Sequence, residues 1–387
     1  MREMRFEFAT AARIVFGAGS VREVAPAAAG LGRRALVVTG AATDRAASLV
    51  ADLGAAGVAC LPFAVAGEPT VDLIRRGAAF AREERCDQVI ALGGGSALDA
   101  GKALAALLAN PGDPLDYLEV IGRGQAPPRP SVPFIAVPTT AGTGSEVTRN
   151  AVLGSPEHRV KASLRSAGML PRLAVVDPDL TLSVPASVTA ATGLDALTQL
   201  IEPYVSLRAN PMTDGFCVDG IRRAATALPR AWEKGDDREA RASMSLAALL
   251  GGLSLTNAGL GAVHGFAAPI GGMFSAPHGA ACAAVLPHAM AVNVQALRAR
   301  APESPALRRY EEVARLLTGS AQASAEAGVQ WVAALCRRLE IPPLRAYGVR
   351  DRDLAELVDK AAQTNSIKGN PIALTGEELR QIAALAR

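Results

Sequence analysis

The sequence of 387 residues has few aromatic residues and almost no excess of charge. Phenylalanine, tryptophan and tyrosine make up only 4% of it, which leaves few side chains that could stack on nucleic-acid bases. Lysine and arginine number 40 against 37 aspartate and glutamate, and the basic residues are scattered along the chain. The basic stripe of a nucleic-acid-binding protein is therefore missing, and we expect no nucleic-acid partner.

Cysteines are also few, and none belongs to a CxxC pair. An odd, dispersed set is typical of reduced thiols in a cytoplasmic protein; the five are Cys60, Cys86, Cys217, Cys282 and Cys336. The N-terminus is charged every few residues and lacks the apolar core of a secretory signal. Residues 242–297 contain no charged side chain, but glycine, proline and polar residues interrupt every apolar run of about 20 residues. We therefore expect a cytoplasmic protein without a membrane segment, with core helices in this region.

The length predicts two domains, and a hydrophobic content of 50% excludes a disordered chain. In the first half, strand-like runs alternate with helical patterns; strands are expected at 34–39, 58–63, 87–92 and 133–138, and helices at about 42–53, 71–84 and after Ser96. Such alternation is typical of a parallel sheet with helical crossovers. From about Pro185 onward the patterns are helical. The sequence thus predicts an α/β domain over residues 1–184 and an all-α domain over residues 185–387.

Two glycine-rich loops each follow a predicted strand. The first, GGGSALD at residues 93–99, opens a helix, where backbone N–H groups can meet a dinucleotide pyrophosphate. Its spacing is not the usual GxGxxG, and alone it is equally typical of a helix-capping turn; Ser96 with Asp99 fits a capping-box variant. The second loop, PTTAGTGSEVT at residues 138–148, interleaves hydroxyl groups with glycines and by itself fits a capped helix entry. Together they indicate a ligand site at the carboxyl ends of parallel strands.

Histidines are rare, and three of the four lie in the segment without charges: the four are His158, His264, His278 and His288. We interpret His288 as a core residue. Asp195 and Gln199 are four residues apart in an apolar helix, so their side chains leave the same helical face. A buried carboxylate needs a partner, and a cation held together with two neutral imidazoles would be one.

These motifs, taken in order, resemble the group III, iron-dependent alcohol dehydrogenase family over essentially the whole chain. The resemblance runs from RIVFGAG at residue 13 through both loops, VDPDL, GLDALTQLIEPYVS, VHGFAAPIGGMFSAPHG and VLPHAM to Asn370-Pro371. It implies a dehydroquinate-synthase-like plan, with a dinucleotide-binding α/β domain, a helical metal-binding domain and a catalytic cleft between them. It also implies an NAD(P)-dependent oxidoreductase that interconverts a small aldehyde and a primary alcohol, assembled as a homodimer or a larger homo-oligomer.

Carried over position by position, the resemblance assigns the metal ligands to Asp195, Gln199, His264 and His278. Gln199 departs from the histidine that the family has there, and Ala268 replaces a histidine that many relatives carry near the nicotinamide. An amide oxygen is a harder and weaker donor than imidazole toward Fe²⁺ or Zn²⁺. We therefore expect a weaker site, a different metal preference or no metal. The alternative for Gln199 is a hydrogen bond within a dry polar core.

The resemblance also assigns the cofactor contacts, on Gly40, Gly94, Gly95, Ser96, Asp99, Thr139, Thr140, Thr143 and Lys161. Sites selective for NAD often carry an acidic residue after a strand, where this chain has Gly40, so we expect NADP(H) to be accepted or preferred. A bound metal would polarise the substrate carbonyl during hydride transfer. Without one, His264 or His278 is the nearest donor to the developing alkoxide. Lys161 is a candidate supporting charge, with a solvated lysine as the alternative.

Two other functions remain open at this point. One is a superfamily lyase or polyol-phosphate dehydrogenase, disfavoured because the core of the helical domain lacks the basic residues that a phosphorylated substrate demands. The other is a degenerate nucleotide-binding protein without catalysis, which Gln199 and Ala268 keep open. The sequence does not identify the substrate.

Overall fold

The computed structural model describes residues 5–274 and 276–387, which form two compact units. One unit comprises residues 9–140 and 144–182. The other comprises residues 5–8, 141–143 and 183–387. The second unit thus includes residues 141–143, which belong to the second glycine-rich loop at residues 138–148.

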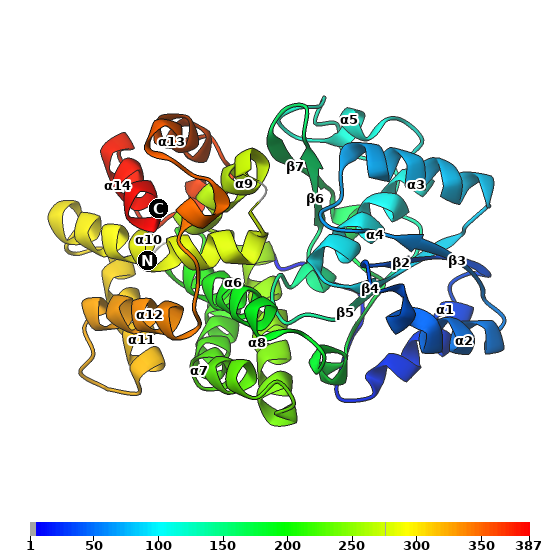
Figure 1. Cartoon of the computed structure of the whole chain (residues 1–387), viewed down its shortest axis with the longest axis horizontal. Coiled ribbons are helices and arrows are strands. Elements are labelled where there is room, and N and C mark those ends of the chain that lie inside the picture. Colours follow the sequence, from blue (N-terminus) through cyan, green and yellow to red (C-terminus); the bar gives the residue numbers. More distant parts are fainter. Residues whose placement is uncertain (1–4, 275) are drawn as a thin grey trace. The chain divides into compact units, whose positions relative to one another are not determined.

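A six-stranded sheet forms the centre of the first unit (Figure 1). Its order is β1-β8-β5-β4-β2-β3, and every neighbouring pair is parallel. The strands are β1 (Ile14–Phe16), β2 (Arg34–Thr39), β3 (Ala59–Ala64), β4 (Gln88–Gly93), β5 (Phe134–Pro138) and β8 (Leu173–Val176). The central strands β4 and β5 are buried along their whole length, as expected for runs of apolar residues between two helical layers.

Helices cover both faces of this sheet. On one face α1 (Val24–Ala29) and α2 (Ala47–Ala55) share a core with alternate residues of β2, β4 and β5. On the other face α3 (Val71–Glu83) and α4 (Gly95–Ala109) share a second core with the remaining residues of those strands. The short α5 (Pro114–Tyr117) lies on this second side, together with an antiparallel hairpin of β6 (Asn150–Ser155) and β7 (Val160–Arg165).

The predicted fold class is confirmed, but the sequence analysis did not list the hairpin or the sheet strands β1 and β8. The predicted strands appear within one or two residues of their expected bounds. In β6 the burial alternates residue by residue, because only one face packs on the core. The segment also carries exposed polar residues at 157–159. Its half-buried pattern is a weaker signal than the continuous apolar runs of the parallel strands.

The second unit is helical, and its described residues contain no strand. Its helices are α6 (Ala186–Val205), α7 (Pro211–Glu233), α8 (Arg238–Ala258), α9 (Ala262–Phe274), α10 (His278–Arg300), α11 (Pro305–Thr318), α12 (Ala325–Arg338), α13 (Leu354–Ala362) and α14 (Gly376–Ala386). Side-chain caps start several of them: Asn210 accepts from the N–H of Thr213, and Asp237 from that of Ala240.

Helix α10 is long and apolar enough to cross a membrane by length and composition alone. Its most apolar window is 78% buried inside the protein, however, so it is a core helix. The uncharged segment 242–297 thus forms α8, α9 and α10 of the helical unit, apart from Ser275, which lies outside the described residues.

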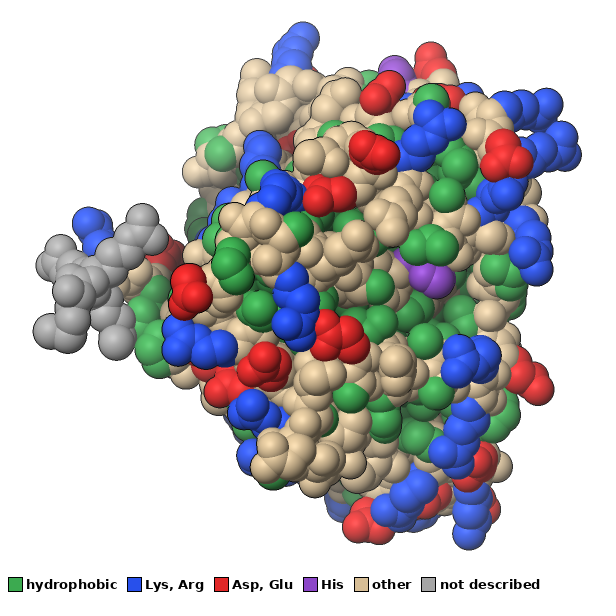
Figure 2. Space-filling view, turned by 90° about the vertical axis from the view of Figure 1, so that its left-hand side faces the viewer, with side chains coloured by type: hydrophobic (Ala, Val, Ile, Leu, Met, Phe, Trp, Pro, Cys, Tyr) green, Lys and Arg blue, Asp and Glu red, His purple; other side chains and the backbone are tan. Residues whose placement is uncertain are grey.

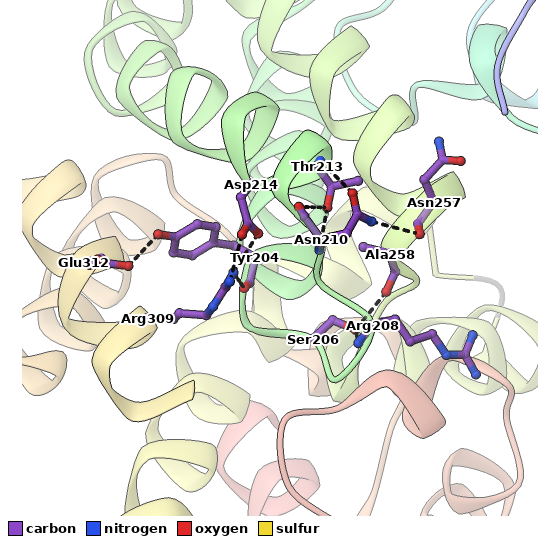
Figure 3. A network of polar contacts seen from close by, with 10 residues as sticks. All are labelled: Tyr204, Ser206, Arg208, Asn210, Thr213, Asp214, Asn257, Ala258, Arg309 and Glu312. Atoms are coloured by element: carbon purple, nitrogen blue, oxygen red, sulfur yellow. Dashed lines mark hydrogen bonds and ion pairs between the residues drawn. The ribbon is translucent and has the colours of Figure 1, made fainter. Parts of the chain in front are cut away.

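Helix α6 packs against α7, α8 and α10, and a polar network fixes its C-terminal end (Figure 3). The Arg309 guanidinium donates to the Tyr204 carbonyl at 2.7 Å and to both oxygens of Asp214. It also lies 4.9 Å from the centroid of the Tyr204 ring, while the Tyr204 hydroxyl donates to Glu312. Ser206 donates to the Ala258 carbonyl, which joins the end of α6 to the end of α8. This network holds in place a helix that carries several of the candidate site residues.

Charges of both signs are interspersed over the face drawn in Figure 2. Neither basic nor acidic side chains cover a broad area of that face, so it carries no extended field of one sign.

Candidate metal centre and cofactor loops

Four potential metal-binding side chains meet inside the helical unit. Asp195 comes from α6, His264 from α9, and His278 and Cys282 from the first two turns of α10. One donor atom from each lies within 4.8 Å of all the others. Asp195, His264 and Cys282 are buried, whereas the His278 side chain is 35% exposed, so the cluster is accessible from the His278 side.

A glycine lets the start of α10 approach α6 this closely. A Cβ atom added at Gly279 would lie 2.7 Å from the carbonyl oxygen of Ala191, a backbone atom that cannot move aside. Any larger residue at position 279 would push His278 away from Asp195, which lies one turn further along α6 than Ala191.

Asp195 is a buried carboxylate without an adequate partner. It is 1% exposed, and neither of its oxygens has a hydrogen-bond partner among the described residues. The nearest nitrogens are His264 Nε2, at 3.4 Å from Oδ1, and His278 Nε2, at 3.7 Å. Leaving a buried carboxylate unpaired is costly, and a cation bound between it and the two imidazoles would remove that cost. The residues present therefore fit a divalent metal.

Glu202 orients His264, a role that the sequence analysis did not assign. It lies two helical turns after Asp195 on the same side of α6. Its Oε2 is 2.6 Å from His264 Nδ1, and its Oε1 accepts from the N–H of Val263 at 2.7 Å. When Nδ1 donates to this carboxylate, the neutral form of His264 has its lone pair on Nε2, which faces the cluster.

Asn370 is a second buried side chain that, like Glu202, accepts a hydrogen bond from a backbone N–H at the start of α9. Asn370 Oδ1 accepts from the N–H of Ala262 at 3.1 Å, and its Nδ2 donates to Asn293 Oδ1 at 2.7 Å. A Cβ atom at Gly261 would lie 2.9 Å from Glu202 Oε1 and 3.0 Å from Asn370 Oδ1, so glycine is needed for both caps. The start of α9, and with it His264, is thus fixed by residues from distant parts of the chain.

The electrostatics of the cluster favour positive charge. Burial by itself would lower the pKa of His278, but Cys282 and Asp195 outweigh burial and raise that pKa to about 9. Burial likewise opposes the change at His264, yet Cys282, Asp195 and Glu202 raise its pKa well above the usual value. For Asp195, burial would raise the pKa, but the neighbouring His278 and His264 hold it below its usual value. Protons and a metal cation therefore compete for the same donors.

Gln199 is buried on α6, and its amide oxygen has no hydrogen-bond partner in the part of the chain that the structure describes. The alternative that this oxygen accepts a hydrogen bond in a dry polar core is therefore not seen. The side chain packs against α8 instead: a Cβ atom at Gly251 would lie 3.2 Å from Gln199 Cβ and 3.6 Å from its Oε1.

Of the predicted metal ligands, Asp195, His264 and His278 meet in the cluster, and the sequence analysis missed Cys282. Gln199 Oε1 is buried without a partner among the described residues, as the Asp195 oxygens are, so its assignment as a ligand stays a prediction. A sequence signal for Cys282 existed. It lies four residues after His278, and this spacing puts both side chains on one face of α10.

The two glycine-rich loops lie side by side at the carboxyl ends of neighbouring strands β4 and β5. Gly94 precedes α4 without a side-chain cap, which leaves the N–H groups at the helix start available to a phosphate. The Thr139 N–H donates to the Gly93 carbonyl at 3.0 Å, and Thr140 Oγ1 would lie 3.4 Å from a Cβ atom at Gly94. Among the other predicted cofactor residues, Ser96 is part-exposed in the first turn of α4.

Asp99 binds residues from later in the chain and does not cap its own helix, and its predicted contact with the cofactor stays a prediction. Its Oδ1 accepts from Ser145 Oγ at 2.6 Å, and its Oδ2 accepts from the N–H of Val152 at 2.9 Å. Lys102, fully buried one turn later, lies 3.3 Å from Oδ1 and donates to the Ser145 carbonyl. The expected capping box of Ser96 with Asp99 is therefore wrong, and Asp99 instead fixes the second loop and the start of β6.

The remaining predicted residues occupy varied positions. Lys161 on β7 is buried and paired with Glu68, its Nζ donating to Oε1 at 2.6 Å, so it is not a solvated lysine. Thr143 belongs to the helical unit. Gly40 follows β2, and a Cβ atom there would meet nothing within 4 Å. Ala268 is part-buried in α9.

Comparison with known proteins agrees with this architecture. The family model of the iron-containing alcohol dehydrogenases matches residues 11–178, and that of the C-terminal part of the Fe-containing alcohol dehydrogenase family matches residues 189–386. Alcohol dehydrogenase 4 of Schizosaccharomyces pombe is 38% identical over 315 residues, which are 81% of this chain and 72% of that protein. The NAD-dependent methanol dehydrogenase of Bacillus methanolicus is 34% identical over 95% of this chain and 96% of its own length.

Solved structures give the same result. The crystal structure of a 1,3-propanediol oxidoreductase superposes with a TM-score of 0.91 at 33% identity, covering 99% of this chain and all of that one. An alcohol dehydrogenase from Oenococcus oeni has a TM-score of 0.89 at 32% identity over 99% of this chain and all of its own.

A parallel α/β unit with two glycine-rich loops, joined in one chain to a helical unit with a buried donor cluster, defines a nicotinamide-dependent, metal-binding class of oxidoreductases. The chain belongs to the iron-containing alcohol dehydrogenase family. We predicted an NAD(P)-dependent alcohol dehydrogenase or aldehyde reductase, and this membership confirms an NAD-dependent alcohol dehydrogenase of small alcohols or aldehydes.

Proposed function

We propose that this protein interconverts a short aldehyde and its primary alcohol with NAD(P)(H), and that a divalent metal bound by Asp195, His264 and His278 is required. The observation that carries the proposal is the buried, unpartnered carboxylate of Asp195, which faces two imidazole nitrogens at 3.4 and 3.7 Å. When bound, the metal polarises the substrate carbonyl, or lowers the pKa of the alcohol in the reverse direction.

The residues of the chain prepare this chemistry. Glu202 keeps the His264 Nε2 lone pair directed at the cluster, and the tight contact at Gly279 holds His278 beside Asp195. The part-exposed His278 marks the side from which a substrate oxygen reaches the donors, while Asp195 and Cys282 close the opposite side to water. Relatives named for methanol and for 1,3-propanediol support short, uncharged substrates, whereas another relative is named for long-chain alcohols.

For the cofactor, we propose that the pyrophosphate binds at the start of α4, on the N–H groups of Gly95 and Ser96, with Thr139 and Thr140 beside it. Gly40 leaves open space after β2 and presents no carboxylate that would repel a 2′-phosphate. NADP(H) should therefore be accepted at least as well as NAD(H). The ion pair of Lys161 with Glu68 supports a role for Lys161 in positioning the β6–β7 hairpin. A contact between Lys161 and the cofactor stays a prediction.

Steady-state oxidation of NADH and of NADPH with a panel of short aldehydes tests this function. The expected result is turnover with small neutral aldehydes and little with phosphorylated ones. Absence of turnover with every aldehyde and both cofactors, in protein supplied with Fe²⁺ or Zn²⁺, would refute it. We further propose a homodimer or larger homo-oligomer in the cytoplasm, a reducing compartment in which its five free cysteines stay thiols.

A further inference from the structure

We infer that Cys282 is a thiolate ligand of the metal and takes the fourth position that the family gives to a histidine. The resulting donor set is Asp195, His264, His278 and Cys282. The inference rests on the proposed metal requirement, and it assigns a ligand that the sequence analysis did not consider.

Four of the six distances between the donor atoms are close to the edges of a tetrahedral site, and the other two are below 4.8 Å. With metal–nitrogen and metal–oxygen bonds of about 2.0–2.1 Å, two such donors lie about 3.4 Å apart; a sulfur at about 2.3 Å lies about 3.6 Å from a nitrogen. Cys282 Sγ is 3.8 Å from His264 Nε2 and 3.7 Å from His278 Nε2. Asp195 Oδ1 is 3.4 and 3.7 Å from the same two nitrogens.

The surroundings of Cys282 differ from those of the other buried cysteines. Cys336 donates to the backbone carbonyl of Ala283 at 3.5 Å, as a structural thiol does. Cys282 is fully buried, and its sulfur lies beside the two imidazole nitrogens that face Asp195, in the same cluster as that carboxylate. A thiol serving only to fill space would not need two metal-binding nitrogens as its neighbours.

The position of Gln199 explains why the fourth donor comes from another helix. Its side chain packs on Gly251 of α8, and an amide oxygen is a weaker donor than the imidazole it replaces. Cys282 reaches the cluster from the second turn of α10, on the same face as His278.

This exchange changes the chemistry of the site. Asp195 and Cys282 together bring two negative charges to the cation, whereas one aspartate with three neutral ligands brings one. Thiolate is a soft ligand, and a site that contains one favours Zn²⁺ more than a site with only nitrogen and oxygen ligands does. We therefore expect this chain to retain Zn²⁺ in preference to Fe²⁺, in contrast to the metal after which the family is named.

Zinc K-edge X-ray absorption of the wild-type protein loaded with Zn²⁺ tests the inference without any substitution. The expected spectrum contains one sulfur neighbour at about 2.3 Å and nitrogen or oxygen neighbours at about 2.0–2.1 Å. A spectrum with nitrogen and oxygen neighbours alone would overturn the inference and leave the dehydrogenase proposal intact. One sulfur neighbour in a protein that turns over no aldehyde would support the inference and contradict the proposed function.

Three variants identify the sulfur. Cys282→Ser should remove the sulfur signal and weaken Zn²⁺ binding by at least about 100-fold, more than is typical of a change outside the ligand shell. Cys217→Ser, at another fully buried cysteine of the helical unit, is the matched control and should keep both. Gln199→Ala should also keep the sulfur signal. Loss of Zn²⁺ in Gln199→Ala with full retention in Cys282→Ser would overturn the inference.

Discussion

Replacing Glu202 by glutamine tests how far an outer residue controls the metal centre. The carboxylate accepts two buried hydrogen bonds, from the N–H of Val263 at 2.7 Å and from His264 Nδ1 at 2.6 Å. A glutamine of the same shape has one acceptor oxygen, so its NH₂ group must face one of these two donors. Either the start of α9 loses its cap or His264 loses the acceptor that fixes its tautomer. We expect metal affinity to fall by about 10- to 100-fold, which corresponds to ~1.4 to ~2.8 kcal/mol.

The assay is a competition for Zn²⁺ between the protein and a chelator of known affinity, read by the free chelator. Glu312→Gln is the control, because Glu312 also accepts one short hydrogen bond, from the Tyr204 hydroxyl, but lies outside the donor cluster (Figure 3). Its metal affinity should equal that of the wild type. Equal affinities for wild type and Glu202→Gln, with the fold intact by circular dichroism, would refute the reasoning.

Three further substitutions have defined outcomes. The backbone of Gly95 lies outside the left-handed region, so Gly95→Val adds no backbone strain of that kind, and its side chain should fill the space of the pyrophosphate. Calorimetry on the folded variant should show a large loss of cofactor affinity, and unchanged binding would disprove the phosphate site. The new side chain of Gly40→Asp would meet open space and would repel a 2′-phosphate. The ratio of kcat/KM for NADPH to kcat/KM for NADH should therefore fall at least about 10-fold. A constant ratio would show that another residue recognises the ribose. Burial raises the pKa of Glu146 to about 7, so the folded protein binds this proton more tightly than the unfolded chain, whose glutamate has the usual value of 4.5. Stability should therefore fall as pH rises from 4.5 to about 7, and Glu146→Gln should flatten the Tm profile over that range; identical profiles for the two proteins would contradict this assignment.

The sequence predicted those features that depend on local pattern. Continuous apolar runs identified β2, β4 and β5, because a strand covered on both faces needs apolar residues at every position. Glycines and hydroxyl residues directly after β4 and β5 identified the two loops, since the carboxyl ends of parallel strands share one edge of the sheet. Asp195, His264 and His278 stood out because polar residues are rare in an apolar, uncharged region.

What the sequence left open depends on contacts between distant residues. The role of Glu202 needs α6 and the start of α9 to meet, and these are 61 residues apart at the bond to Val263. Asp99 looked like a cap for its own helix, but its carboxylate instead binds Ser145 and Val152 from a later part of the chain. Tertiary hydrogen bonds of this kind replace local capping without leaving a periodic signal.

Metal replacement in the assay of aldehyde reduction tests the central claim most directly. The protein is stripped with a chelator, shown to be metal-free by elemental analysis, and then titrated with Zn²⁺ or Fe²⁺ while NAD(P)H oxidation by a short aldehyde is followed. Metal dependence through Asp195, His264 and His278 predicts no turnover in the stripped protein and a rise that saturates at about one ion per chain. Full turnover in the metal-free protein would contradict the claim.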